Sequence, residues 1–391
     1  MSGVAVGPRR PGSTKYAPEV PKRDVLTHIP ARVSSFWHQN TYCYRIPRRL
    51  DRVLVRAGRP GRVFRAFLTA AGMLRQRHRF RAAVVASDTT GNLFALLQSL
   101  LCSRRLPTVM VDCLWYLPRS PVIRCLKALQ LQVESRSVSR FVVWAAHEVE
   151  SYSRAFGIPE HKFVFMPFHT TLLGYEYKVS AGGYIFSGGN GDRDYATLAL
   201  AVGDLGVRTI VATTNRAAFK GVPIPDNMRV LPCDHAEFRR LMAGARVVVV
   251  PMEAGLLHSG GQQTYLNAMA MGKPVILCDS RGAEGYIEHG VGGIIVASGD
   301  PDALRRALRS LLAQPDLAAE MGRKARERIE RGGYSTDDCM RAIAELARRC
   351  ACDSAPRAPT ARQPGRSPAW PALAPRCPER RSSAPRCRGQ G

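Results

Sequence analysis

The chain has 391 residues, of which 45% are hydrophobic and 23% are charged. This balance is that of a globular protein and excludes wholesale disorder, a collagen-like chain and a small disulfide scaffold. The length exceeds the roughly 250–300 residues that one core organises, so we expect two domains. The 57 basic residues, nearly all arginine, outnumber the 31 acidic ones and give a formal charge of +26.

Three interpretations of this charge are open: a nucleic-acid surface, a face for an anionic membrane, or a compositional bias toward arginine that has no function. Nucleic-acid binding rests on charge alone, without a recognised motif, and is the least favoured. Eleven cysteines are scattered without a C-x-x-C pair, which favours reduced thiols over zinc or disulfides. No stretch reaches the roughly 18 apolar residues of a membrane span, and no signal sequence opens the chain. We expect a cytoplasmic protein without a metal site.

Both ends of the chain differ from its middle. Residues 1–35 are rich in Pro and Arg and show no sustained period, so we predict an irregular basic segment. Residues 350–391 contain Ala, Pro, Arg and Ser with scarcely an aliphatic residue, which predicts a disordered tail. Next to the first segment, aromatic residues precede an arginine-rich amphipathic stretch, and this region either rests on an anionic bilayer or packs on the protein. These residues are Phe36, Trp37, Tyr42, Tyr44, Leu50, Val53, Leu54 and Val55.

Short apolar runs alternate with helical patterns in two series. In residues 36–168 the runs 82–86, 108–112, 141–144 and 162–166 predict strands, with helices near 92–102, from Ser120-Pro121 onward and at 148–156. Residues 169–182 lack such a pattern and predict a hinge. In residues 183–349 the runs 184–187, 208–212, 229–231, 246–250, 274–278 and 293–296 predict strands, with a last helix at 335–349. This order predicts an α/β fold of two Rossmann-like doubly wound domains facing across a cleft, with disordered basic termini.

Ligands of such sheets bind beyond the carboxyl ends of the strands, so the loops after the apolar runs are the candidate sites. One glycine-rich loop runs from Gly188 to Tyr195 and contains Arg193, which can pair with a phosphate. The alternative is a flexible turn with a solvated arginine. A second glycine-rich turn, beginning at Ser259, opens a small-residue helix in which Asn267 can reach sugar hydroxyls. The alternative there is a closely packed helix, for which the small residues Ala268 and Ala270 provide room. Neither loop matches the dinucleotide fingerprint or the P-loop.

The stretch from Asn267 to Ile276 (N-A-M-A-M-G-K-P-V-I) is followed by glycines at 282, 290, 293 and 299. From about residue 184 to 346 the chain resembles the nucleotide-sugar half of a GT-B glycosyltransferase of the family 4 type. The resemblance implies a metal-independent, usually retaining transferase that needs no cofactor besides its nucleotide-sugar co-substrate. The second domain would hold the donor, and the first a saccharide or lipid-linked acceptor of cell-surface polysaccharide synthesis, on the inner face of the membrane. The implied donor-binding residues are Gly188, Gly189, Arg193, Ser259, Gly260, Gly261, Gln262, Gln263, Thr264 and Asn267.

The sequence departs from the family pattern in two places. The two glutamates of the family fall on Ser259 and Asn267, so uncharged hydrogen bonds would replace both carboxylates. The basic pair for the diphosphate is reduced to Arg193, because Gly189 stands at the first basic position. The central prediction is that the turns near Gly189 and Gly261 converge on one pyrophosphate.

The loops of the first domain carry the candidates for chemistry on the acceptor. Transfer requires an acceptor hydroxyl within reach and a weak base. Asp112 and His147 follow strands and are predicted catalytic residues, whereas Asp88, Thr89 and Thr90 are predicted to contact the acceptor. Helix capping is the alternative for Asp88, Asp112 and His147.

Other functions remain open on the sequence alone. The missing glutamates suit a non-catalytic GT-B-like binding subunit. A GT-B epimerase is a further alternative, as is a phosphorylase, although Lys220 and Lys273 lack a context for a pyridoxal cofactor.

Overall fold

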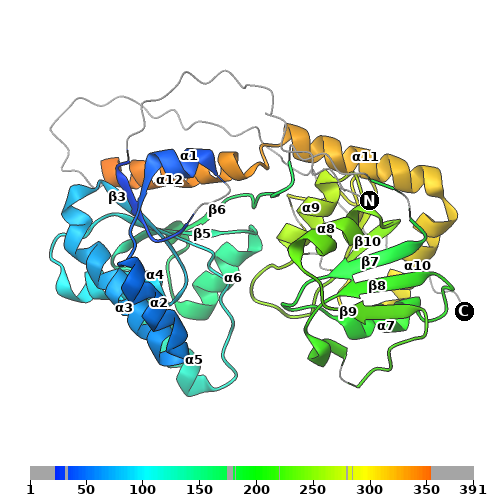
Figure 1. The fold of residues 1–391 in the computed structure, drawn as a ribbon, viewed down its shortest axis with the longest axis horizontal. Coiled ribbons are helices and arrows are strands. Elements are labelled where there is room, and N and C mark those ends of the chain that lie inside the picture. Colours follow the sequence, from blue (N-terminus) through cyan, green and yellow to red (C-terminus); the bar gives the residue numbers. More distant parts are fainter. Residues whose placement is uncertain are drawn as a thin grey trace, which may run out of the picture. The chain divides into compact units, whose positions relative to one another are not determined.

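The computed structural model describes residues 23–30, 34–173, 179–180, 182–219, 221–278, 281–283 and 285–353. The predicted tail from residue 354 onward, most of the predicted N-terminal segment and the middle of the predicted hinge lie outside them. Within the described residues, two six-stranded parallel sheets carry helices on both faces (Figure 1). The predicted α/β architecture with two doubly wound sheets is confirmed. Apart from the N-terminal segment and the last helix, which are described below, the predicted domain boundaries stay predictions.

The first sheet has the strand order β2-β1-β3-β4-β5-β6, and all neighbouring strands are parallel. Their carboxyl ends therefore lie at one edge. The strands are β1 (Val25–Thr27), β2 (Thr41–Cys43), β3 (Ala82–Ala86), β4 (Thr108–Val111), β5 (Val138–Val143) and β6 (Phe163–Phe165).

Each face of the first sheet has its own core. Residues of α3, α4, α5 and α6 pack on one face with Phe141 and Met110, and residues of α1 and α12 pack on the other with Val84. The helices are α1 (Ser35–Asn40), α2 (Arg48–Arg56), α3 (Gly58–Gln76), α4 (Thr89–Leu101), α5 (Pro121–Glu134), α6 (His147–Phe156) and α12 (Thr336–Asp353).

The end of the chain returns to the first sheet. The sequence predicted that the last helix belongs to the second domain and that order ends at residue 349. Instead, α12 packs Ile343 and Cys350 against the face that holds Trp37 and Val84, and it continues to Asp353. Both expectations were wrong because the apolar stripe of α12 fits an uncovered sheet face far away in the sequence, which periodicity cannot reveal.

The N-terminal strands were also missed. β1 lies within residues 1–35, which were predicted to be irregular, and it sits between β2 and β3. Its three residues, Val-Leu-Thr, are fully buried but too few to show a period.

The second sheet has the order β12-β11-β10-β7-β8-β9, again parallel throughout. Its strands are β7 (Tyr184–Gly188), β8 (Arg208–Ala212), β9 (Met228–Leu231), β10 (Val247–Pro251), β11 (Val275–Cys278) and β12 (Ile294–Val296). The helices around it are α7 (Tyr195–Val202), α8 (His235–Ala243), α9 (Gln262–Ala270), α10 (Pro301–Ala313) and α11 (Pro315–Arg331). No described helix combines the length and apolar character that a bilayer span requires.

Candidate functional site

The turn after β7 wraps the backbone around one of its own side chains. Gly189 has a φ of 123°, a region that only glycine enters freely. A Cβ at this position would lie 2.9 Å from Nη2 of Arg193, so there is also no space for a side chain. Asp194 ends the turn and caps α7 by accepting the N–H of Thr197 at 2.9 Å. The local sequence thus forms a cradle for Arg193.

The turn before α9 closes on the same side chain. Gly261 immediately precedes α9 and has a φ of 81°. A Cβ there would lie 2.7 Å from Cγ1 of Val250 and 3.6 Å from Nη2 of Arg193. The turns at Gly189 and Gly261 therefore converge on one guanidinium. That they hold a pyrophosphate stays a prediction.

The guanidinium of Arg193 is buried, with 6% of the residue exposed. It donates to the carbonyl of Gly191 at 2.9 Å, to the carbonyl of Gly188 at 3.3 Å and to Oγ1 of Thr264 at 3.4 Å. Within the described part of the chain, no carboxylate forms an ion pair with it. Burial lowers the pKa of Arg193. A buried cation without a counter-ion is costly, so this arrangement favours the binding of an anion nearby.

A cavity of about 610 Å³ opens at the carboxyl ends of β7, β8 and β9. Gly189 and Thr264, which both contact Arg193, line it, so the guanidinium lies directly behind its wall. Gln263 and Asn267 of α9 line it as well. The volume lies in the usual range for a small-molecule site. Four of the predicted donor-binding residues thus border one cavity.

The sequence analysis missed the far side of this cavity. Its lining there comes from the loops after β8 and β9, with Thr213, Thr214 and Cys233, and from the start of α8, with Phe238. Oδ1 of Asn190 accepts the hydroxyl of Thr213 at 2.8 Å and the N–H of Thr214 at 2.9 Å, which joins the loops after β7 and β8. The rule that singled out the other loops, proximity to the carboxyl end of a strand, would have found these residues too.

Asn267 fastens α9 to the segment after β6. Its Oδ1 accepts the hydroxyl of Thr170 at 2.7 Å, the N–H of Thr171 at 3.1 Å and the amide of Gln263 at 3.3 Å. Thr171 itself lines the cavity. The amide therefore shapes the cavity wall through its neighbours.

A carboxylate from the first sheet reaches the second glycine turn. Oε1 of Glu148 accepts both the N–H of Ser259 at 2.6 Å and its hydroxyl at 2.8 Å. Oε2 accepts the N–H groups of Trp144 at 2.8 Å and Ala145 at 3.0 Å. Glu148 and Ser259 are each 1% exposed. Burial raises the pKa of Glu148, although these hydrogen bonds oppose the shift. The polar groups of Ser259 are thus occupied by Glu148, which ties the Gly260–Gly261 turn to the first sheet.

Asp88 has the capping role that was its alternative. Its carboxylate accepts the N–H of Gly91 at 2.9 Å at the start of α4, where Thr89 and Thr90 form the first turn. It also lies 3.2 Å from Nε2 of His28, a residue at the end of β1 that the sequence analysis missed. Burial alone would raise the pKa of Asp88, but these interactions lower it overall.

Asp112 follows β4 with a φ of 56°, a strained value for a residue with a side chain. Desolvation raises its pKa, a hydrogen bond to Trp144 opposes this, and the charge of Asp88 adds to the rise. Asp112 and Asp88 therefore share one neighbourhood at the edge of the first sheet.

His147 opens α6 and lines a separate hollow of about 240 Å³ with the loop after β10, including His258 and Glu253. Nε2 of His258 lies 3.2 Å from the carboxylate of Asp192, which also accepts the hydroxyl of Tyr116 at 2.9 Å. Asp192, like Asp112, has a positive φ, of 54°. The sequence analysis missed His258, Asp192 and Tyr116, because their partners lie in distant segments.

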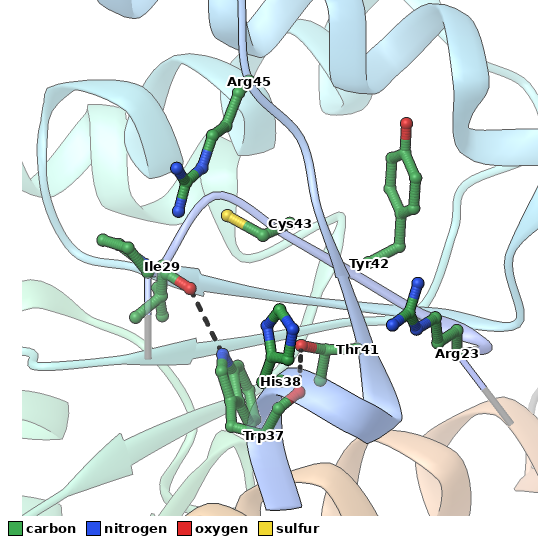
Figure 2. Close-up of a pocket in the computed structure, with 9 residues that line it drawn as sticks. Arg23, Ile29, Trp37, His38, Thr41, Tyr42, Cys43 and Arg45 are labelled. Carbon is green, nitrogen blue, oxygen red and sulfur yellow. Dashed lines mark hydrogen bonds between the residues drawn. The ribbon is translucent and has the colours of Figure 1, made fainter. Parts of the chain in front are cut away.

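Another pocket, of about 400 Å³, lies beside the edge strand β2 (Figure 2). Trp37 lines it, and its indole donates to the carbonyl of Ile29 at 3.2 Å. Trp37 and Phe36 are buried, so these two aromatic residues pack on the protein. Of the two interpretations given for this region, packing holds for them, whereas Leu50, Val53 and Val55 are exposed.

The glycosyl transferases group 1 family matches residues 203–314. This segment contains α8, the Gly260–Gly261 turn and α9. This part of the chain is similar to the group 1 glycosyltransferases. This agrees with the resemblance seen in the sequence.

The chain is also similar to a GDP-mannose-dependent α-(1-6)-phosphatidylinositol monomannoside mannosyltransferase of Mycolicibacterium smegmatis. It is 36% identical over 129 residues, which cover 32% of this chain and 30% of the relative. The match thus spans less than a third of the relative's length.

Solved structures share the GT-B fold. Sucrose-phosphate synthase of Thermosynechococcus elongatus superposes with a TM-score of 0.57 at 18% identity, covering 81% of this chain and 82% of that one. Anabaena HepE in complex with UDP-glucose superposes with a TM-score of 0.55 at 15% identity, covering 71% and 81%. At these identities the likeness shows the fold alone.

Proposed function

We propose that this chain is a group 1 glycosyltransferase that transfers a sugar from a nucleotide-sugar donor to a saccharide or lipid-linked acceptor, with retention of anomeric configuration and without a metal ion. The observation that carries the proposal is the buried Arg193 guanidinium, which lies between two glycine turns beside a cavity of about 610 Å³ and pairs with no carboxylate among the residues that the structure describes. The name of the mannosyltransferase relative and the complex of HepE with UDP-glucose support a nucleotide-sugar donor.

The diphosphate of the donor would sit where the cavity meets the start of α9. The first N–H groups of a helix lack intrahelical partners and favour an anion, and the positive charge behind Thr264 and Gly189 adds to this field. Developing charge on the departing diphosphate would be stabilised in the same place. The nucleoside would extend toward Phe238, whose ring offers a flat apolar surface for a base.

The acceptor would approach from the first sheet. Asp112, or Asp88 with its partner His28, would hold the proton of the acceptor hydroxyl. His147 and His258 line the hollow beside the loop after β10 and would contact the transferred sugar. This assignment keeps the predicted catalytic residues Asp112 and His147 and adds His28 and His258.

A non-catalytic binding subunit is the second candidate. It is favoured by one observation: the side chains at both missing glutamate positions, Ser259 and Asn267, are engaged with protein groups. Such a subunit would bind a nucleotide sugar without breaking it down.

A panel of nucleotide sugars screened by thermal shift identifies the donor, because a ligand that binds only the native state raises the melting temperature. The stabilising donor is then incubated with saccharide and lipid acceptors, and released nucleoside diphosphate is measured. Transfer or slow hydrolysis of the donor supports the enzyme. Stabilisation without turnover supports the binding subunit. The absence of stabilisation by every nucleotide sugar contradicts both.

A further inference from the structure

Four neighbouring helices of the first half expose apolar side chains. α2 packs on α3, α3 on α4, and α4 on α5, and the four appear together in Figure 1. We name their outer surface the apolar-basic face. Its exposed apolar residues are Leu50, Val53 and Val55 of α2, Val63, Phe64 and Phe67 of α3, Leu100 and Leu101 of α4, and Val122, Ile123, Leu126 and Leu129 of α5.

The start of α5 is the most exposed part of this face. All six residues from Pro121 to Leu126 are exposed. Val122, Ile123, Leu126 and Leu129 are 56% to 68% exposed and lie at the spacing of one helix face. A soluble monomer rarely leaves such a stripe uncovered, so this helix end is shaped for contact with an apolar medium.

Arginines surround the apolar side chains. α2 and the start of α3 carry exposed Arg48, Arg49, Arg52, Arg56, Arg59 and Arg62. Asp51, the one acidic residue of α2 and α3, already pairs with Arg65 at 2.5 Å. α4 has no charged residue, and the single acidic residue of α5, Glu134, is buried. The face is therefore apolar and positive, because the one partly exposed carboxylate of these helices, that of Asp51, is already paired.

The positive charge of the apolar-basic face indicates which kind of partner can cover it. A second copy of the chain would bring the same arginines against these arginines. The chain's own outer segments, 1–22 and 354–391, are both net basic, the second through many arginines, and would be repelled as well. A bilayer with anionic headgroups matches both properties, because it offers negative charge at its surface and apolar chains directly below.

The face is linked to the candidate site by a short loop. Residues 112–120 join the end of β4 to the exposed start of α5. Within this loop Tyr116 donates its hydroxyl to Asp192, which is the neighbour of Arg193 in the donor-side turn. A surface that holds α5 therefore also brings the acceptor side of the site to that surface.

We propose that the apolar-basic face docks on an anionic lipid bilayer, with the first two turns of α5 entering the interface between headgroups and acyl chains. This inference deepens the proposed function, on which it rests, by assigning a membrane-borne lipid as the acceptor class. α2 and α3 lie on the bilayer through their arginines, and α5 supplies the apolar anchor.

Vesicle flotation with the full chain tests the proposal. The probes are phosphatidylcholine vesicles with and without about 30% phosphatidylglycerol, an anionic lipid of the kind that attracts basic faces. We expect binding to the anionic vesicles only, weakened in high salt. The double variant Val122→Asp/Leu126→Asp and the double variant Arg48→Glu/Arg52→Glu should each lower the partition coefficient about tenfold or more.

Matched controls come from the second half of the chain. Leu200 on α7 is 50% exposed, and Arg306 on α10 is exposed. Leu200→Asp and Arg306→Glu should bind vesicles like the wild type. Melting temperature and nucleoside-diphosphate affinity, measured without lipid, report whether each variant is folded.

Several results would overturn the docking. These are equal binding to neutral and anionic vesicles, equal loss in the control variants, or a dimer in sedimentation that the α5 variant abolishes. If the wild type binds anionic vesicles but no nucleotide sugar, the docking stands and the proposed function fails. If it binds nucleotide sugars but no vesicles, the reverse holds.

Discussion

Replacement of Arg193 by methionine separates the charge of the candidate site from its shape. Methionine has a similar length but no charge and no donor, so it fills the space between the two glycine turns. The prediction is that Arg193→Met weakens the binding of a nucleoside diphosphate and leaves the binding of the parent nucleoside nearly unchanged.

The expected magnitude follows from the geometry. Nη2 of Arg193 is 3.4 Å from Oγ1 of Thr264, which lines the cavity. A phosphate oxygen that accepts the Thr264 hydroxyl at about 2.7 Å would therefore lie roughly 6 Å from the guanidinium. At an effective dielectric constant of about 20, one unit of charge at that distance contributes about 3 kcal/mol. Counter-ions and water reduce this value, so we expect a 10- to 100-fold rise in Kd, or about 1.4–2.8 kcal/mol.

Isothermal titration calorimetry with UDP, GDP and their nucleosides measures both effects. Arg193→Lys keeps the charge and should retain part of the affinity, and Arg306→Met controls for the change in net charge. An unchanged diphosphate affinity in Arg193→Met would show that the guanidinium does not act on the bound diphosphate. An equal loss for nucleoside and diphosphate would show that the side chain supports the cavity rather than the charge.

Three further substitutions test other parts of the structure. Gly261→Ala should destabilise the protein by about 1–3 kcal/mol, because its φ is positive and the new Cβ would lie 2.7 Å from Val250; an unchanged denaturation midpoint contradicts this. Glu148→Gln removes a charged acceptor of two groups of Ser259 and should cost about 2–3 kcal/mol of unfolding free energy, whereas a neutral outcome in urea denaturation would show that water replaces the contact. Burial raises the pKa of Glu134 to about 7, so its contribution to stability is complete below pH 4.5 and is lost as the pH rises through 7. The free energy of unfolding of Glu134→Gln should therefore rise relative to that of the wild type, by up to about 3 kcal/mol between pH 5 and 8. Melting curves whose difference stays constant with pH would contradict this prediction.

The sequence predicted the parts of this fold that have strong local signals. Apolar β-branched runs such as that of β10 marked the longer strands, and glycines with positive φ marked the two turns around Arg193. The three-residue strand β1 was too short to show a period, so it was missed. The place of α12 depends on which distant sheet face it covers, and no local pattern encodes that choice.

The candidate site divides in the same way. Residues that share one loop with a glycine, such as Arg193 and Thr264, were identified from that loop. Glu148, by contrast, meets Ser259 across 111 positions of sequence, and no pattern near Glu148 indicates this contact. Contacts of this kind are set by how the two sheets come together, which a single sequence does not display.

We propose above that the turns at Gly189 and Gly261 hold the diphosphate of a nucleotide sugar. A crystal structure of the full chain with its stabilising nucleoside diphosphate is the decisive test. We expect the two phosphates to lie at the start of α9, within hydrogen-bonding distance of Thr264, with the base toward Phe238. Phosphates bound elsewhere on the protein, with the cavity beside Arg193 left empty, would contradict this expectation.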